Sequence, residues 1–176
     1  MKKELNGVNI ELITGDITNQ PDCKAVVNAA NAELMPGGGV AGAIHNAAGP
    51  ELAKACRPLA PIIPGEAVIT EGFNLPNPFV IHTLGPIYGI DKPEDKLLQN
   101  CYLNSLKVAE EKGLDSVAFP AISTGAFGYP IKPAAEIALR TLVEMTGNLK
   151  SVKKIRMVLY SQQDFEVHET IFKSLV

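Results

Sequence analysis

The sequence predicts an α/β fold in which helices cover both faces of a central sheet, giving three layers. Short apolar segments with strand character alternate with helical segments over most of the 176 residues. Glycines and prolines separate these segments, and no internal repeat or low-complexity linker interrupts them. With 46% hydrophobic residues, a chain of this length can bury a core without a disulfide or a metal ion. We therefore expect residues 1–176 to form one domain.

The elements follow from hydrophobic periodicity and from the residues that end each segment. The clearest helical pattern is at Asp95–Lys112, where Leu98, Tyr102, Leu106 and Ala109 recur every three or four residues before a glycine. In chain order, the sequence predicts strand Val8–Thr14, strand Ala25–Asn28, helix Val40–Ala48, one or two helical turns in Glu51–Arg57, strands Ala67–Glu71 and Phe79–Leu84, helix Asp95–Lys112, a strand within Ser116–Ile122, helix Pro133–Met145, strand Lys154–Tyr160 and helix Asp164–Leu175.

Charge and cysteine content exclude several functional classes. The net charge of −3 forces no basic face, so nucleic acid is an unlikely partner. Cys23, Cys56 and Cys101 form no CxxC pair, which argues against a zinc site and a disulfide framework and favours a cytoplasmic protein. No apolar run is long enough to span a membrane, so no membrane partner is expected. We expect no cofactor and no metal site, and the histidines are interpreted as structural.

Two polar segments follow predicted strands, where α/β sheets commonly bind ligands. In Gly15-Asp16-Ile17-Thr18, the carboxylate could accept hydrogen bonds from an adenine amino group or a ribose. The alternative is a simple Asx turn or helix cap. In Val27–Asn31, two asparagines bracket two alanines. One asparagine could fix a loop backbone while the other faces a ligand, or both could be structural.

Two glycine-rich segments lie between a strand and a helix. Three successive glycines in Pro36–Ala43 cost chain entropy, and exposed N–H groups at a helix N-terminus suit a phosphate. The spacing is neither GxGxxG nor a P-loop. The Pro120–Pro130 segment offers hydroxyl and amide donors in the same topological position. Together the two segments predict a diphosphate held between them, the alternative being two unrelated turns.

In this order, these segments resemble a macro domain over nearly the whole chain. The most specific parts are Val27–Asn31, Gly37–His45 and Pro120–Tyr129, and Ile81–Pro86 is similar to the bacterial MacroD-type branch. The resemblance implies an α/β/α sandwich around a mixed sheet that binds ADP-ribose without a cofactor. The residues implied to bind it are Asp16 and Ile17 for adenine, Tyr160 packed on the adenine, Asn31 for the distal ribose, Gly38, Gly39 and Val40 for one side of the diphosphate, and Ser123, Thr124, Gly125, Ala126 and Phe127 for the other.

The resemblance also implies a reaction. Proteins of this type remove ADP-ribose from acidic side chains of proteins or deacetylate O-acetyl-ADP-ribose, and Asn31 and Gly39 are the candidate catalytic residues. MacroD-type hydrolases carry an aspartate directly after the Gly-Gly-Gly-Val run, where this chain has Ala41. The enzyme is therefore expected to be slow, with a water held by the substrate's own phosphate as nucleophile. The alternatives are a non-catalytic reader of ADP-ribose, an RNA or poly-ADP-ribose binder, and a phosphatase acting on ADP-ribose 1″-phosphate. A monomer is expected.

Overall fold

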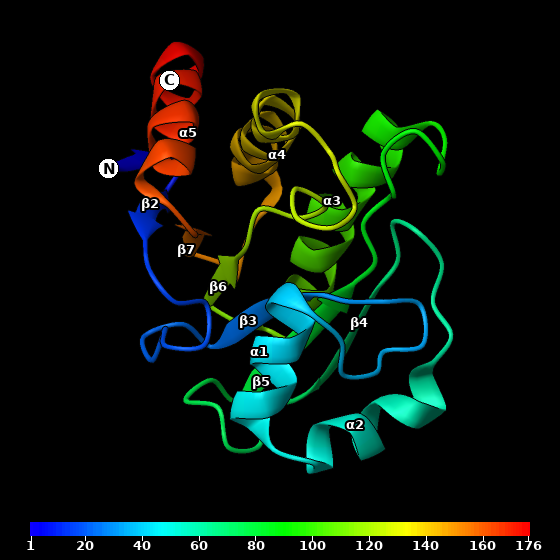
Figure 1. Cartoon of the computed structure of the whole chain (residues 1–176). Coiled ribbons are helices and arrows are strands. Elements are labelled where there is room, and N and C mark those ends of the chain that lie inside the picture. Colours follow the sequence, from blue (N-terminus) through cyan, green and yellow to red (C-terminus); the bar gives the residue numbers. More distant parts are fainter.

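The computed structural model describes residues 1–176 and contains one mixed sheet of seven strands (Figure 1). Five neighbouring strands run parallel, and an antiparallel strand lies at each edge. In spatial order, the strands are β1 (Lys2–Leu5), β2 (Val8–Thr14), β7 (Lys154–Leu159), β6 (Ser116–Phe119), β3 (Ala25–Ala29), β5 (Phe79–Thr83) and β4 (Ala67–Glu71). This architecture confirms the predicted α/β class with its mixed sheet.

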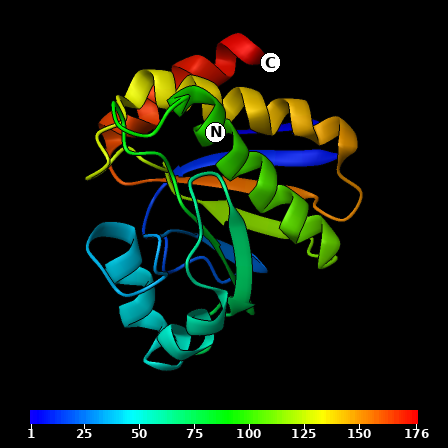
Figure 2. The same ribbon diagram turned by 90° about the vertical axis from the view of Figure 1, so that its right-hand side faces the viewer.

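Helices cover both faces of the sheet and complete three layers, as Figure 2 shows. On one face lie α3 (Glu94–Glu111), α4 (Ile131–Met145) and α5 (Gln162–Leu175), and on the other α1 (Gly39–Ala48), α2 (Glu51–Cys56) and a 3-10 turn at Arg57–Leu59. A second 3-10 turn at Thr146–Asn148 follows α4. Each face has its own apolar cluster, of 28 and 15 buried residues. No helix combines the length and apolar composition that crossing a membrane would require.

The predicted elements are present, with small differences at their ends. Strand β2 has the predicted bounds, whereas α5 begins two residues earlier than expected because Ser161 caps it, accepting a hydrogen bond from the Asp164 N–H at 3.1 Å. Helix α4 begins at Ile131, so Pro133 lies in the first turn, where its missing N–H has no intrahelical partner to lose. Strand β1 was not predicted, because its charged, exposed residues have no alternating apolar pattern.

The topology places all ligand-competent loops at one edge of the sheet. The parallel strands β2, β3, β5, β6 and β7 point the same way, so the segments that follow them leave from the same edge. The chain order within the sheet reverses between β7 and β3, which is the position where such sheets form a crevice. The two glycine-rich segments are therefore brought together although they are far apart in the sequence.

Candidate functional site

Two adjoining cavities form a cleft at this edge. One, of about 490 Å³, is lined by Gly15, Asp16, Ile17, Gly39, Val40, Ala43, Pro120, Ala121, Thr124, Gly125, Val158, Tyr160 and Asp164. The other, of about 270 Å³, is lined by Ala29, Ala30, Asn31, Gly37, Gly38, Gly39, Val40, Ala41, Gly85, Ala121, Ile122, Ser123, Gly125, Ala126 and Phe127. We call these the proximal and the distal cavity. Every residue predicted to bind the ligand lines one or both, and the shared residues include Gly39, Val40 and Gly125.

The first wall is the start of α1. Gly38 precedes the helix in an extended conformation, with φ −88° and ψ 179°, and Gly39 has the positive φ of 56° that favours glycine. No side chain caps this helix, so N–H groups of its first turn lack partners within the protein. A Cβ at Gly42 would overlap the Gly37 carbonyl oxygen, which shows that the turn closes on a third glycine that sequence reasoning did not assign to the site.

The second wall is the loop from Ser123 to Tyr129. It is closed by the Tyr129 N–H, which donates to the Ser123 carbonyl at 2.9 Å, and by the Gly128 N–H, which donates to the Gly125 carbonyl at 3.0 Å. The N–H groups of Ser123, Gly125, Ala126 and Phe127 donate to no protein acceptor. Thr124 differs, because its N–H and its hydroxyl both donate to the Ala121 carbonyl, at 3.4 Å and 2.8 Å. The loop thus presents a row of free main-chain donors.

Ser123 adopts an unusual conformation at the start of that loop. Its φ is 67°, a region that non-glycine residues rarely occupy, and its buried hydroxyl has no hydrogen-bond partner. A Cβ at Gly85 would overlap the Ser123 hydroxyl oxygen. Gly85, in the segment after β5, therefore has to be glycine for the loop to approach, and it lines the distal cavity. Because these two residues are 38 positions apart, no local sequence pattern indicates this requirement.

The proximal cavity carries an acceptor, a donor and an exposed ring. Asp16 Oδ1 accepts hydrogen bonds from the Thr18 N–H at 2.9 Å and the Thr18 hydroxyl at 2.7 Å, while Oδ2 has no partner. These bonds lower the pKa of Asp16, so the carboxylate is ionised at neutral pH. The Ile17 N–H is free, and the Tyr160 side chain is 95% exposed beside it. Asp164, at the start of α5, also lines this cavity and was not predicted.

Buried polar side chains hold the Asp16 turn in place. Gln20 Nε2 donates to the Asp16 carbonyl at 2.8 Å, and Gln20 Oε1 accepts from the Arg156 guanidinium at 3.0 Å. Arg156 in turn pairs with Glu11 on β2 at 2.8 Å. Asn77 Nδ2 donates to the Gln20 carbonyl at 2.8 Å from the other side. The turn is therefore preorganised rather than shaped by a ligand.

The two asparagines after β3 have different surroundings. Asn31 lines the distal cavity and is half-buried. Its Nδ2 donates a hydrogen bond to the Met35 carbonyl at 2.8 Å, and its Oδ1 accepts one from the Met35 N–H at 3.0 Å. Because Nδ2 has a second hydrogen and Oδ1 a second lone pair, the amide can also bind a ligand. Asn28 is fully buried and does not line the cleft. Its Nδ2 lies 3.1 Å from Nδ1 of His82.

His82 lies in a buried polar group beneath α1, outside both cavities. Its Nδ1 accepts from Asn28, and its Nε2 lies 2.9 Å from the Thr70 hydroxyl, which donates to the Glu71 carbonyl at 3.1 Å. This arrangement is satisfied by a neutral ring protonated on Nε2. Burial, together with His45 nearby, lowers the pKa of His82 to about 3. Burial also lowers the pKa of His45, whose ring nitrogens have no partners. Neither histidine lines the cleft, and their structural role stays a prediction.

A pH dependence of stability follows from His82. The unfolded chain binds a proton at this residue with a pKa of about 6.5, whereas the folded protein binds it only near pH 3. Since the unfolded state holds more protons in between, we expect the free energy of unfolding to fall as the pH drops from about 6.5 to 5. Urea unfolding at both pH values, with an NMR titration of the His82 ring, tests this. A ring that titrates near pH 6.5 in the folded protein would contradict it.

The cleft lacks the cationic side chains that usually bind anions, and its distal cavity also lacks side chains that usually act as bases. No lysine or arginine lines either cavity, and no Asp, Glu, His, Cys, Lys, Arg or Tyr lines the distal one. The polar character of the distal cavity comes from the two rows of main-chain N–H groups, the positive end of the α1 dipole, and the Asn31 and Ser123 side chains. No group of Asp, Glu, His and Cys side chains that could hold a metal ion is present. Such a cleft can bind a diphosphate through the backbone.

Comparisons with known proteins agree with this geometry. The Macro domain family model matches residues 27–138. The O-acetyl-ADP-ribose deacetylase of Citrobacter rodentium is 48% identical over 167 residues, covering 92% of this chain and 94% of the relative. The Oceanobacillus iheyensis macrodomain with ADP superposes with a TM-score of 0.95 at 43% identity, covering 99% and 95% of the two chains. The Trypanosoma brucei macrodomain in complex with ADP-ribose gives 0.86 at 34% identity, covering 92% and 68%. The chain belongs to the macro domain family.

Proposed function

We propose that this protein binds ADP-ribose and hydrolyses ADP-ribose esters at the distal ribose. The observation that carries the proposal is the pair of facing main-chain donor rows, at the start of α1 and in the Ser123–Tyr129 loop. They suit a diphosphate, and the cavities on either side suit a nucleoside and a second ribose. The related deacetylase and the ADP-ribose complex of the Trypanosoma brucei macrodomain support this assignment.

Each end of the ligand has a matching set of residues in the proposal. Adenine lies in the proximal cavity, with its amino group donating to Asp16, the Ile17 N–H as a second contact and the Tyr160 ring packed on its face. Gly38, Gly39 and Val40 hold one side of the diphosphate, and the Ser123–Phe127 segment holds the other. The distal ribose enters the distal cavity, where the Asn31 amide orients it. Gly39 acts through its backbone, since it has no side chain.

Hydrolysis in this cavity proceeds without a protein general base. A water bound to the substrate's own phosphate attacks C1″ of the distal ribose, the C1″–O bond to the acyl group breaks, and its electron pair leaves on the carboxylate. The water's proton passes to solvent or to the departing carboxylate. The protein contributes position, through Asn31 and the two loops. Since general base catalysis typically contributes about 10²–10⁴-fold, we expect slow turnover.

Replacing Ala41 with aspartate is expected to increase turnover. Ala41 lines the distal cavity from the first turn of α1, where an acidic side chain is favourable for the helix dipole. A carboxylate there can accept the proton of the attacking water, so kcat should rise by roughly 10²-fold while ADP-ribose affinity changes little. Single-turnover assays on glutamate-linked ADP-ribose and calorimetry with ADP-ribose measure the two effects. An unchanged kcat would show that the missing base does not limit the rate.

The absence of a carboxylate at Ala41 also favours a second candidate, a non-catalytic reader of ADP-ribose. The two candidates differ in turnover alone. Incubation of the wild-type protein with an automodified, glutamate-linked protein and with O-acetyl-ADP-ribose, both at high enzyme concentration, separates them. Release above buffer supports the hydrolase. Binding of ADP-ribose without release from either substrate supports the reader.

The setting in which the protein works is part of the proposal. All three cysteines are free and buried, which is compatible with a reducing cytoplasm. We propose ADP-ribosylated proteins and O-acetyl-ADP-ribose as the partners, and residues 1–176 as one macro domain acting as a monomer. Size-exclusion chromatography with light scattering tests the oligomeric state.

A further inference from the structure

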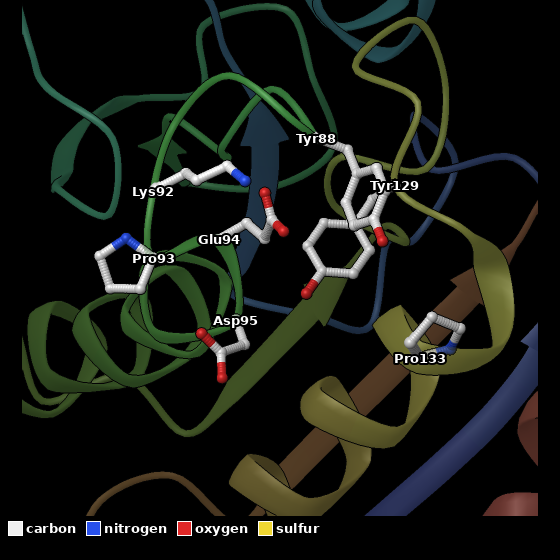
Figure 3. A pocket seen from close by; sticks show the side chains of 7 residues that line it. All are labelled: Tyr88, Lys92, Pro93, Glu94, Asp95, Tyr129 and Pro133. Carbon is white, nitrogen blue, oxygen red and sulfur yellow. The ribbon is translucent and has the colours of Figure 1, made fainter.

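A third cavity, of about 720 Å³, is lined in part by Tyr129, at the end of the Ser123–Tyr129 loop whose other residues line the distal cavity. Figure 3 shows its lining side chains, Tyr88, Lys92, Pro93, Glu94, Asp95, Tyr129 and Pro133. They come from the segments after β5 and β6 and from the first turns of α3 and α4. The cavity therefore opens at the same edge of the sheet as the cleft, and the mechanism above does not use it.

Part of the lining of this cavity is aromatic. The rings of Tyr88 and Tyr129 are tilted by 56°, with centroids 4.8 Å apart (Figure 3). Tyr129 is buried, while Tyr88 is 43% exposed, so a ring face is available. The Tyr88 N–H donates to the Phe127 carbonyl at 2.9 Å, and Phe127 lines the distal cavity. The segment that carries Tyr88 is thus tied to the loop that lines the distal cavity.

The opposite wall carries unpaired negative charge. Glu94 accepts one hydrogen bond, from the Gly89 N–H at 3.0 Å, and Asp95 accepts one, from the Lys96 N–H at 2.8 Å. Neither carboxylate forms an ion pair, and each has a second oxygen without a partner. Lys92 is the only cation in the lining, and it too forms no ion pair. Burial and the charges of Asp95 and Glu94 raise the pKa of Tyr129, so its ring stays neutral.

Carboxylates facing an aromatic surface select an organic cation. The two charges attract it, and the exposed face of the Tyr88 ring can contact it through a cation–π interaction. A metal ion is a poorer fit, because no three ligating side chains gather here. An anion would meet two carboxylates against one lysine. An exposed aromatic ring beside acidic groups suits a basic side chain of a protein.

We propose that this cavity binds a lysine or arginine side chain of the ADP-ribosylated protein, near the modified residue. The inference rests on the proposed hydrolase function and specifies its substrate class. O-acetyl-ADP-ribose has no peptide part and does not reach the cavity. The cavity therefore raises kcat/KM for modified proteins with basic neighbours and leaves the small ester unaffected.

Two synthetic peptides test the proposal, each carrying one glutamate-linked ADP-ribose. Lysines flank the modified glutamate in one, and norleucines replace them in the other. Wild-type protein should favour the lysine peptide in kcat/KM by about tenfold, and less so at high salt. In the Glu94→Gln/Asp95→Asn double variant, this ratio should fall to near one with O-acetyl-ADP-ribose turnover unchanged. The matched Glu4→Gln/Glu111→Gln variant removes two exposed carboxylates elsewhere and should keep the ratio.

A Tyr88→Leu variant checks the aromatic wall independently and should also reduce the ratio. Equal kcat/KM for the two peptides with the wild-type protein would overturn the inference. So would a ratio that the double variant leaves intact. If the wild-type protein turned over neither peptide nor O-acetyl-ADP-ribose, the proposed function itself would fail and the inference with it. Turnover of all three substrates without a preference would reject the inference alone.

Discussion

Replacing Gly38 with leucine should weaken ADP-ribose binding strongly and leave the fold intact. Gly38 has an extended backbone that any residue can adopt, and a Cβ added there meets no atom within 4 Å. The empty space is the distal cavity itself. A leucine side chain would therefore occupy the volume of the diphosphate and keep it from the α1 N–H groups. We expect the affinity to fall about 100-fold or more, equivalent to roughly 2.7 kcal/mol.

Calorimetry with ADP-ribose and thermal unfolding of the same samples measure this effect. Gly147→Leu is the matched control, because Gly147 is exposed, has no contact closer than 4.0 Å at its Cβ position and lies outside the cleft. That variant should bind like the wild type. If Gly38→Leu bound ADP-ribose with unchanged affinity, the diphosphate would not lie between the two loops.

Asn31→Ala should reduce turnover far more than binding. The amide is the only side-chain group in the distal cavity, besides the Ser123 hydroxyl, that can hydrogen-bond a ribose. Without it the ribose is no longer held in line with the attacking water, and misplacement of this kind costs roughly 100-fold in rate. The diphosphate and adenine contacts remain, so ADP-ribose affinity should change much less.

Because Asn31 also pairs with the Met35 backbone, its loss can loosen the loop. Asn46→Ala, an exposed change on α1, is the control for kcat, and urea unfolding of both variants measures the structural cost. A parallel fall in kcat and in affinity would assign Asn31 to the loop rather than to the reaction. An unchanged kcat would remove it from the mechanism.

Local patterns in the sequence were sufficient to predict most of the fold. Gly113 follows α3 and Gly49 follows α1, both at positive φ, so these glycines identify the helix ends correctly. Strand β1 was missed in the sequence-based prediction because an exposed edge strand needs no alternation of apolar residues. The Asp16 turn agrees with its structural interpretation, since one carboxylate oxygen closes an Asx turn, and Asp16 also lines the proximal cavity, where its binding role stays a prediction.

The predicted ligand residues line one cleft, and their roles remain predictions. Contacts between segments that are distant in the chain could not be predicted from the sequence. Gly85 matters because Ser123 approaches it, and Asp164 joins the proximal cavity only because α5 begins beside β2. Gly42 could have been inferred, since it continues the glycine run of the α1 turn. The cavity at Tyr88 and Tyr129 also depends on loops that meet only in the folded protein.

In the proposed binding mode, main-chain N–H groups hold the diphosphate, and amide NMR observes these groups directly. We predict that ADP-ribose shifts the amide resonances of Val40, Gly125, Ala126 and Phe127 and slows their hydrogen exchange, whereas adenosine leaves these four nearly unchanged and perturbs Ile17. Binding of ADP-ribose that leaves the four amides unperturbed would contradict the account.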